Sequence, residues 1–486
     1  MAIFIKGRDG SADSLRKKAR RQGWLSLGHG IYCQTGDDPN SLVFSNWQDI
    51  VHSIFPDAIV SHRTAIRLRP EKDTIFLTRP VSAYRNYKVG PLAISVTPGD
   101  VQIGTWPIGK ELRASGDARA WLENLSASRR RGAVPRALGQ EALEVELDKV
   151  MARNGEIYLK ATRQEANVIA PQLHLEEEAA KLDAIVGALC ATRPHSGILK
   201  SDRAIARANR KPFDAHIVNC FDALVRALGS HDLPAIKTQL DRQSWRHQAF
   251  IESYFSNYIE GTRFGLSEAE EIVFERQVDE SRHADSHDIL AVYDIAVDVD
   301  QMLVTPSAPD DFRQMLRRRH AFLMHDRPDK RPGQWKEKPN QAGNVMFAAP
   351  EAVNGTLTQG LERYLDLPAG FARAVFMHFV ITQVHPFDDG NGRLARLFLS
   401  AELVSAEESK IVIPNVKRDD YINGLRMANR DEDFRIMLKV MTQLYRYTAA
   451  LPWRDYDEIV TTLQVHHAFD SPDEGLIRFS RALRDI

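Results

Sequence analysis

A short turn between two apolar stretches constrains the fold of this chain more than any other feature. FARAVFMHFVITQV at 371–384 and RLARLFLSAELV at 393–404 both carry apolar residues at helical spacing. Between them, Pro386, Gly390 and Gly392 break the helical pattern. The sequence therefore predicts two helices joined by a loop, with the glycines close to the start of the second helix.

The turn itself, HPFDDGNGRLAR at 385–396, gathers residues suited to binding phosphate. Backbone N–H groups at a helix start lack partners and lie at the positive end of the helix dipole, so Gly390 and Gly392 predict an anion site. Arg393 and Arg396 share a helical face, where their guanidinium groups can bind phosphate oxygens in pairs. Because cations in a first helical turn oppose the dipole, these arginines indicate an anionic ligand.

Three other side chains of the turn suit a reaction at that phosphate. His385, with an ordinary pKa of ~6.5, is best placed to remove a proton from a hydroxyl group at neutral pH. Asp389 suits Mg²⁺, which takes one or two carboxylates and completes its shell with phosphate oxygens and water. Asn391 can orient a phosphate oxygen through its amide. The alternative interpretation is a buried structural histidine in an ordinary turn between helices.

The turn resembles the signature of the Fic family, H-x-F-x-D/E-G-N-G-R-x-x-R, at every fixed position. Fic proteins typically transfer AMP from ATP to a Ser, Thr or Tyr hydroxyl of another protein. The resemblance implies an all-helical core, ATP as the AMP donor, His385 as general base and Asp389 on Mg²⁺. It also implies an anion site at Gly390 and Gly392, with Asn391 on the α-phosphate and Arg393 and Arg396 on the β- and γ-phosphates.

A second stretch, IESYFSNYIEGTRFGL, carries Ser256 and Glu260 one helical turn apart, with Gly261 as the expected end of the helix. It resembles the S/T-x-x-x-E-G/N pattern on the inhibitory helix of many Fic proteins, expected here at about 245–261. The physical basis is competition for a cation, because Glu260 paired with Arg396 occupies the guanidinium group that should hold the γ-phosphate. The alternative is a solvated helical glutamate.

Two further segments extend the resemblance. The Pro- and Gly-containing segment at about 333–347 has strand-like ends, and Fic proteins carry here a hairpin flap that pairs with the target's backbone as an added strand. IVIPNVKRDDYINGLRMANRDEDFRIML resembles the helix that closes over the nucleoside, with Tyr421 as the expected nucleotide contact. Many members have paired tyrosines where this chain has Tyr421 and Ile422, so a nucleotide other than ATP is the alternative.

The whole chain has the size and balance of a multidomain globular protein. Its 486 residues are enough for two or more domains, 43% are hydrophobic, and the formal net charge is −1. Any binding to nucleic acid or membrane must therefore come from a local patch. Cys33, Cys190 and Cys220 lie far apart and show no spacing typical of a metal site. Because no signal peptide or long apolar run is found, we expect a cytoplasmic protein without membrane contact.

The N-terminal region combines a basic helix with short strands. Ser11 is a candidate N-cap, and two short strands are expected around Gly28 and Gly30. ARRQGWLSLGHGIYC and IVSHRTA resemble the abortive-infection antitoxin family of transcriptional regulators, whose members carry a winged helix-turn-helix. The resemblance implies that the basic helix and a wing at 28–32 contact DNA phosphates. The alternative is a solvated basic face.

The expected fold class is mainly α, with an all-helical Fic core and a small β-hairpin flap, preceded by an α+β winged-helix-like domain. We expect a winged helix-turn-helix-like domain at 1–105, a helical, charged connecting region at 106–231, the Fic domain at 232–455 and a C-terminal helical tail at 456–486. The predicted function is transfer of AMP to a target protein, inhibited by Glu260; no oligomeric state is predicted. The alternatives are removal of AMP in the same site, and a DNA-binding regulator or toxin–antitoxin component that senses nucleotide.

Overall fold

The computed structural model describes residues 3–109, 112–128, 134–231, 235–238, 241–278, 280–343 and 345–483. The chain divides into two compact units, Met1–Arg210 and Lys211–Ile486. This division differs from the boundaries at 105/106 and 231/232 that the sequence predicts. Within the segment predicted as a helical tail, 456–486, the side chains of Ile459, Leu463 and Phe479 are buried in the core of the second unit.

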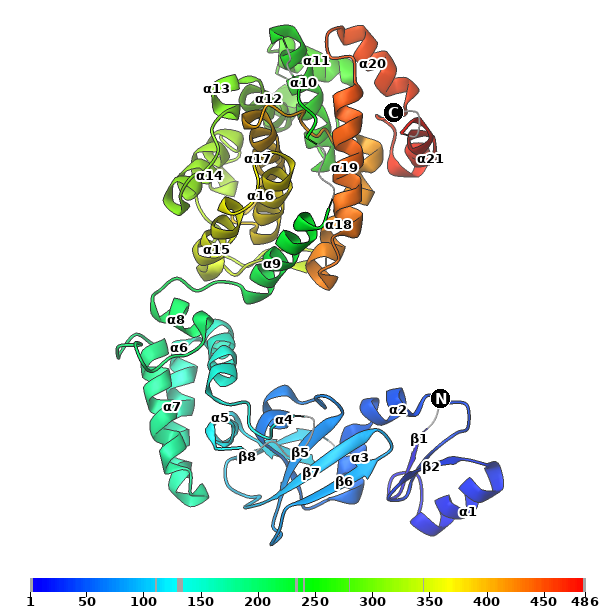
Figure 1. Ribbon diagram of the computed structural model, residues 1–486, viewed down its shortest axis with the longest axis vertical. Helices are drawn as coiled ribbons and strands as arrows, with labels where there is room; N and C mark the ends of the chain where they lie inside the picture. Colours follow the sequence, from blue (N-terminus) through cyan, green and yellow to red (C-terminus); the bar gives the residue numbers. More distant parts are fainter. Residues whose placement is uncertain are drawn as a thin grey trace. The chain divides into compact units, whose positions relative to one another are not determined.

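The first unit contains two sheets (Figure 1). A three-stranded antiparallel sheet has the order β1-β3-β2, and a six-stranded sheet has the order β6-β7-β5-β4-β9-β8. In the larger sheet β5 pairs with β7 and β4 with β9 in parallel, whereas the other neighbours are antiparallel. The strands are β1 (Ile3–Ile5), β2 (Leu25–Gly28), β3 (Ile31–Cys33), β4 (Ile59–Val60), β5 (Thr74–Arg79), β6 (Arg85–Val89), β7 (Leu92–Pro98), β8 (Thr105–Gly109) and β9 (Leu112–Ser115).

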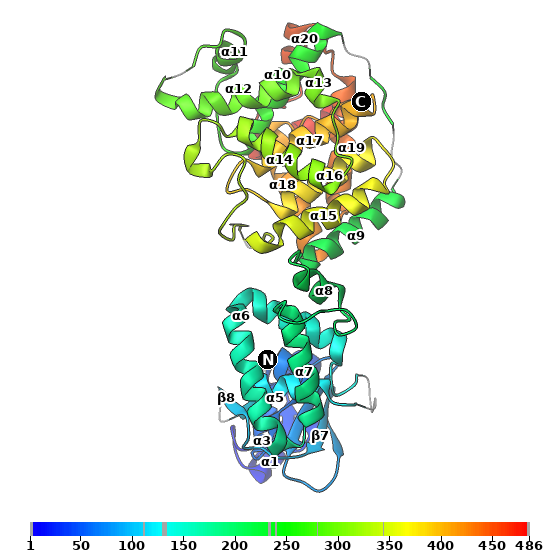
Figure 2. The ribbon, with the colours of Figure 1, turned by 90° about the vertical axis from the view of Figure 1, so that its left-hand side faces the viewer.

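Helices cover and extend these sheets. They are α1 (Ala12–Gln22), α2 (Pro39–Ser45), α3 (Trp47–Ile54), α4 (His62–Arg67), α5 (Asp117–Leu125), α6 (Gln140–Leu173), α7 (Glu176–Leu189) and α8 (Asp202–Ala208). Figure 2 shows α6 beside α7, and α6 is interrupted at Gly155, which has a φ of 83°. Leu143, Leu147 and Leu182 belong to the core between these helices, which is distinct from the core of the sheets.

The expected N-terminal helix and hairpin are present, but a winged helix is not confirmed. The side chain of Ser11 caps α1 by accepting a hydrogen bond from the backbone N–H of Ser14, and β2 and β3 form the hairpin. A wing follows its helix-turn-helix, whereas here the helix pair α2 and α3 comes after the hairpin. The hairpin also belongs to a sheet with β1. Contact with DNA therefore stays a prediction of the sequence.

Figure 1 shows the second unit as a group of helices, and its described residues also form one short hairpin. The hairpin strands are β10 (Gln341–Ala342) and β11 (Val345–Met346). The helices are α9 (Ala215–Gly229), α10 (Arg242–Ile259), α11 (Leu266–Phe274), α12 (His283–Val297), α13 (Val299–Met302), α14 (Pro309–Leu323), α15 (Val353–Leu365), α16 (Phe371–Val384), α17 (Asn391–Ser405), α18 (Arg418–Asp431), α19 (Arg435–Ala450), α20 (Tyr456–Val465) and α21 (Pro472–Ala482).

The two helices predicted on either side of the turn, α16 and α17, are packed together in the interior of this unit. Every residue of α16 except Arg373 is buried. A helix that is apolar on all sides has to be surrounded by other elements, and α9 and α15 pack against α16 while α10, α12 and α14 pack against α17. The turn is therefore anchored at both ends by buried helices. Among the described helices, none has the length and apolar character needed to cross a bilayer.

Candidate active site

His385 ends α16 in an unusual backbone conformation. It has a φ of 49° and a ψ of 60°, in the left-handed region that residues other than glycine seldom adopt. Its Nδ1 lies 3.3 Å from the carbonyl oxygen of Thr382. Because a carbonyl oxygen only accepts hydrogen bonds, Nδ1 carries the hydrogen and Nε2 keeps the lone pair. The imidazole is therefore oriented as a base that can accept a proton on Nε2.

The hairpin lies against His385. β10 and β11 pair within the segment predicted as a flap at 333–347, of which residue 344 is outside the described residues. Phe347 stacks on the imidazole, with ring centroids 3.9 Å apart and an interplanar angle of 2°. Burial lowers the pKa of His385 to about 4; the bond to Thr382 opposes this shift, and the positive charge of Lys336 adds to it. The imidazole is therefore neutral at pH 7.

The turn after His385 is braced by its own side chains. Asn391 Oδ1 accepts a hydrogen bond from the backbone N–H of Phe387 at 3.0 Å, and its Nδ2 donates to the carbonyl of Phe387 at 2.9 Å. Phe387 is fully buried and stacks on His320, with ring centroids 3.7 Å apart. The sequence predicts Asn391 on a phosphate, but both ends of its amide are bonded to the turn. These bonds hold the shape of the turn, and a contact of Asn391 with phosphate stays a prediction.

The start of α17 has the features of an anion site. Gly390 is the N-cap with a φ of 74°, and a Cβ there would lie 2.7 Å from Sδ of Met324. Within the described part of the chain, no acceptor bonds the backbone N–H groups of residues 391–393. Asp389 Oδ1 accepts a hydrogen bond from the N–H of Gly390 at 2.7 Å, and no described residue donates to its Oδ2. That oxygen fits a single carboxylate ligand to Mg²⁺.

Arg396 lies in a buried network with the helix α10. Its Nε donates to Ser256 Oγ at 2.9 Å, and its Nη2 donates to the carbonyl of Ser256 at 3.0 Å and to Glu260 Oε1 at 2.6 Å. Glu260 is the C-cap of α10, directly before Gly261 at a φ of 99°, and its side chain is 29% exposed. Burial alone would raise the pKa of Glu260, but Arg396 outweighs it and holds the pKa below its usual value.

Arg393 has different partners from Arg396, although both lie in the first turn of α17. Its Nη1 lies 2.7 Å from Oδ2 of Asp288 on α12, and the same oxygen accepts a hydrogen bond from Nη2 of Arg327 at 2.7 Å. Asp288 is 1% exposed. Arg327 also pairs with Asp285 at 2.8 Å, so two guanidinium groups are balanced by two carboxylates beside the turn. No local sequence pattern predicts Asp288, because it reaches the turn from a separate helix.

Lys336 and Asn340, at the base of the hairpin, hold the backbone of the turn. Together they donate to four successive carbonyl oxygens, those of residues 384–387. The ammonium of Lys336 donates to the carbonyl of residue 384 at 3.2 Å, and its backbone N–H donates to the carbonyl of residue 386 at 2.9 Å. Nδ2 of Asn340 donates to the carbonyl of residue 385 at 3.4 Å and to that of residue 387 at 2.9 Å. Oδ1 of Asn340 accepts a hydrogen bond from Nζ of Lys336 at 2.6 Å. Burial lowers the pKa of Lys336 to about 7.

A cavity of about 340 Å³ lies beside these residues. Five of the sequence-predicted residues line it: His385, Glu260, Gly392, Arg396 and Tyr421. Its lining also includes the apolar side chains of Ile259, Val345, Phe347, Ile422 and Leu425. A pocket with a few converging polar groups and a largely apolar wall is typical of sites that bind a nucleoside.

The other predicted residues do not line this cavity. Asp389, Gly390, Asn391 and Arg393 belong to the turn and the start of α17, and Ser256 is buried against Arg396. Tyr421 meets the network through its hydroxyl group, which lies 2.7 Å from Nε2 of His378 and 3.5 Å from Nη1 of Arg396. The predicted residues therefore lie in a cavity and in the turn that adjoins it.

Comparison with known families finds a match that includes this turn. Residues 311–403 match the Fic/DOC family, and this segment includes α15, α16, the turn and most of α17. The chain is similar to "Protein adenylyltransferase Fic" of Drosophila persimilis, at 24% identity over 198 residues, 39% of this chain and 38% of that protein. The protein of the same name in Drosophila ananassae is 23% identical over 228 residues, 43% of this chain and 45% of that protein. The chain thus spans less than half the length of these relatives.

Solved structures of Fic proteins also resemble the chain. Fic-1 from C. elegans aligns at 17% identity and a TM-score of 0.38, covering 67% of this chain and 88% of that one. A Fic domain containing signaling protein from Bacteroides thetaiotaomicron aligns at 17% identity and a TM-score of 0.37, covering 51% and 96%. Because both scores are below 0.5, these structures add no support for a function.

Proposed function

We propose that this chain is a nucleotidyltransferase that transfers AMP from ATP to a Ser, Thr or Tyr hydroxyl of a target protein. One observation carries the proposal: a neutral imidazole and a helix start with unbonded N–H groups meet at one cavity, which His385, Gly392 and Arg396 line. The Fic/DOC match over 311–403 and the activity in the relatives' names support the same reaction.

In the proposed reaction the hydroxyl oxygen of the target attacks the α-phosphorus of ATP. The bond from that phosphorus to the bridging oxygen breaks in line, and pyrophosphate leaves. Nε2 of His385 takes the hydroxyl proton. A pKa of about 4 keeps this nitrogen unprotonated at pH 7. The negative charge of bound phosphates raises that pKa, which makes the imidazole a stronger base when substrate is present.

The other groups of the site stabilise charge and position the substrates. The N–H groups of residues 391–393 and the guanidinium of Arg396 stabilise negative charge on the phosphates, and Arg393 contributes from its pair with Asp288. Mg²⁺, which Asp389 would hold, supplies further neutralisation of phosphate charge when bound. The exposed strand β10 offers an edge to which the target's backbone can add, and this places a target hydroxyl beside His385.

The pair between Glu260 and Arg396 accounts for inhibition in the resting protein. Arg396 already donates three hydrogen bonds to Ser256 and Glu260. Oε1 of Glu260 also lies 2.1 Å from the position that a Cβ of residue 392 would take, beside the helix start proposed to bind the phosphates. A γ-phosphate therefore has to displace a carboxylate from both positions, and like charges oppose that exchange.

The test is label transfer from ATP labelled at the α-phosphate, with the purified 486-residue chain alone and with added target proteins. We expect His385→Ala to abolish transfer with the fold intact, because the base is lost; persistent transfer would refute the assignment. Glu260→Gly should raise self-modification, since Arg396 becomes available. The matched control is Glu275→Gly, because Glu275 is the C-cap of α11 with the same backbone region as Glu260. An equal rise in both variants would exclude a specific inhibitory pair.

Removal of AMP in the same site is the second candidate. Glu260 lines the cavity together with His385, and its partly exposed carboxylate could orient a water molecule towards a bound AMP ester. The same labelled proteins distinguish the directions. Loss of label from a modified protein that is fast in the wild type and slow in Glu260→Gly supports removal. Gain of label that is faster in Glu260→Gly supports transfer.

A further inference from the structure

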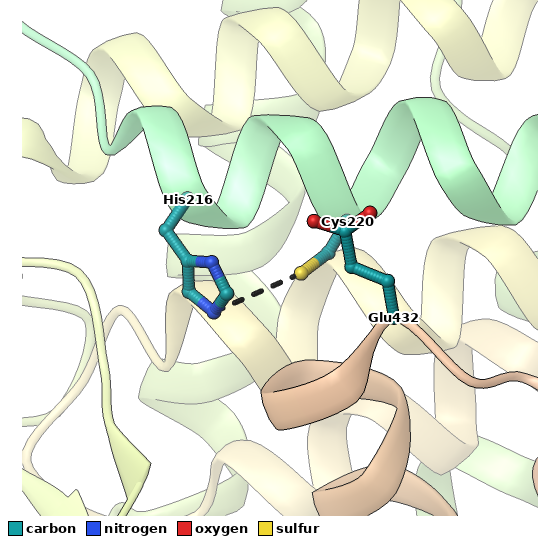
Figure 3. A group of neighbouring side chains, drawn as sticks. All are labelled: His216, Cys220 and Glu432. Carbon is teal, nitrogen blue, oxygen red and sulfur yellow. Dashed lines mark hydrogen bonds between the residues drawn. The ribbon is translucent and has the colours of Figure 1, made fainter. Parts of the chain in front are cut away.

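A histidine, a cysteine and a glutamate meet on the second unit outside the cavity described above. His216 and Cys220 are one turn apart on α9, and Glu432 is the C-cap of α18 (Figure 3). Nε2 of His216 lies 3.9 Å from Sγ of Cys220, and the ligand atoms of all three residues lie within 4.8 Å of one another. His216 and Glu432 are exposed, whereas Cys220 is buried beneath them.

We propose that His216, Cys220 and Glu432 bind a zinc ion, with a water molecule as the fourth ligand. Zinc prefers a tetrahedral set of nitrogen, sulfur and oxygen ligands. With the usual Zn–S and Zn–N bond lengths, tetrahedral angles place sulfur and nitrogen roughly 3.6 Å apart. The observed 3.9 Å between Sγ and Nε2 is close to that spacing. Binding therefore requires only small side-chain movements.

The charges around the thiol favour a cation. The carboxylate of Glu432 lies within 4.8 Å of the thiol sulfur, and the carboxylate of Asp214 accepts a hydrogen bond from the backbone N–H of His216 at 2.9 Å. A cation at this position would interact favourably with both carboxylates. On binding, the Sγ–H bond breaks, the proton goes to solvent, and sulfur donates an electron pair to the metal. The thiol therefore releases one proton for each ion bound.

A chain of hydrogen bonds connects the cluster to the cavity. The thiol of Cys220 donates to the carbonyl of Asn429 at 3.5 Å, and Nδ2 of Asn429 donates to Oε1 of Gln383 at 2.7 Å. Gln383 lines the cavity. A metal that replaces the thiol proton also removes the hydrogen bond to Asn429, at the end of the helix that carries Tyr421. Metal binding itself does not depend on the proposed function.

A second histidine group provides an internal comparison. His283 and His325 lie 3.4 Å and 3.9 Å from Asp326, and the rings of His287 and His325 are 6.1 Å apart. This group is looser than the set around Cys220, and it has no thiol. Surface histidines bind zinc weakly without a defined site, so His325→Ala is a suitable control for such binding.

The test is zinc titration of the metal-free, reduced 486-residue chain in competition with a chromophoric chelator. We expect one zinc ion per chain, with His216→Ala, Cys220→Ala and Glu432→Gln each weakening binding about tenfold or more. Cys190→Ala and His325→Ala should leave binding unchanged. His216 is exposed, so its variant tests the site even if Cys220→Ala disturbs the fold.

Cobalt gives an independent readout of the sulfur ligand. The cobalt-loaded chain should show a thiolate-to-metal charge-transfer absorption that Cys220→Ala removes and Cys190→Ala retains. Three results would overturn the proposal: no stoichiometric binding, binding that is unchanged in His216→Ala and Cys220→Ala, or binding that is lost in His325→Ala. The last result would assign the metal to the group around Asp326 instead.

Discussion

At the scale of single residues, Gly392 is the point where the inhibitory contact and the anion site coincide. A Cβ at this position would overlap Oε1 of Glu260, the far end of a flexible side chain, and would lie 3.2 Å from Nη1 of Arg396. The backbone of Gly392 is helical, so the conformation itself accepts alanine. The effect of a methyl group therefore depends on whether Glu260 is present.

We predict that Gly392→Ala lowers the free energy of unfolding in the wild type but raises it in the Glu260→Gly variant. In the wild type it should destabilise the protein by about 1 kcal/mol, because Glu260 is displaced from Arg396. In Glu260→Gly it should stabilise by roughly 0.5 kcal/mol, because alanine is the better helix former. Chemical denaturation of the four proteins measures the coupling. An equal cost in both backgrounds would show that Glu260 does not sit over this glycine.

Glu402 predicts a pH dependence of stability. It is 2% exposed, both of its carboxylate oxygens accept from the hydroxyl of Tyr364 at 2.9 Å, and burial raises its pKa to about 7. The ordinary value of 4.5 applies in the unfolded chain, so the folded state holds the extra proton between these two pH values. The stabilisation by this group is full below pH 4.5 and is lost as the pH rises to 7.

Glu402→Gln removes this titration. Relative to the wild type, the variant should gain on the order of 3 kcal/mol of unfolding free energy between pH 4.5 and pH 8. Urea unfolding across that range measures the difference. Glu362→Gln, on the exposed surface of α15, serves as the control and should show no such trend. A constant difference for Glu402→Gln would mean that the carboxyl group does not titrate in this window.

At the scale of elements, Lys336 and Asn340 connect the hairpin segment to the turn through hydrogen bonds. Their four bonds to the carbonyls of residues 384–387 fix the strained backbone of His385.

Lys336→Met should keep the binding of ATP but lower kcat of label transfer roughly 10- to 100-fold, because the imidazole loses its alignment. Lys338→Met, on an exposed neighbour, should have no effect. Faster amide hydrogen exchange at 384–388 should accompany the loss of kcat, and unchanged exchange would contradict this role.

The sequence predicts the turn and its two helices because each signal there is local. Apolar periodicity marks α16 and α17, and Pro386 with two glycines marks the break between them. Lys336 and Asp288 are missed because each is an isolated polar residue whose importance arises only when a distant segment packs against the turn. The hydrogen bonds of Asn391 back to the turn are missed for a different reason, since an amide can bond either a ligand or its own backbone.

At the scale of the whole chain, long-range packing limits what the sequence predicts. The mixed sheet contains β4, which has two residues, and two parallel pairings between strands that are not adjacent in the chain. Neither feature leaves a period-two pattern long enough to detect. The division at 210/211 differs from the predicted boundary at 231/232 for a similar reason. Phe221 and Leu224 of α9 are fully buried in the core of the second unit, although their segment resembles the preceding charged helices.

The core clusters lead to a prediction about where the chain can be cut. One cluster contains only residues from the second unit, and the two others contain only residues from the first. A fragment of 211–486 should therefore unfold cooperatively on its own. With Glu260→Gly it should take up AMP within about twofold of the rate of the full chain, because every proposed site residue lies within it.

A fragment of 232–486, cut at the boundary that the sequence predicts, is the matched comparison. It lacks α9, and removing one buried phenylalanine side chain alone costs about 3–5 kcal/mol. That is a large part of the stability of an ordinary domain. We therefore expect this fragment to lose cooperative unfolding and label transfer together, as measured by circular dichroism during heating and by α-labelled ATP. Equal stability of the two fragments would mean that α9 is dispensable for the core. If the fragment 211–486 does not fold in isolation, the first unit is needed to stabilise the second.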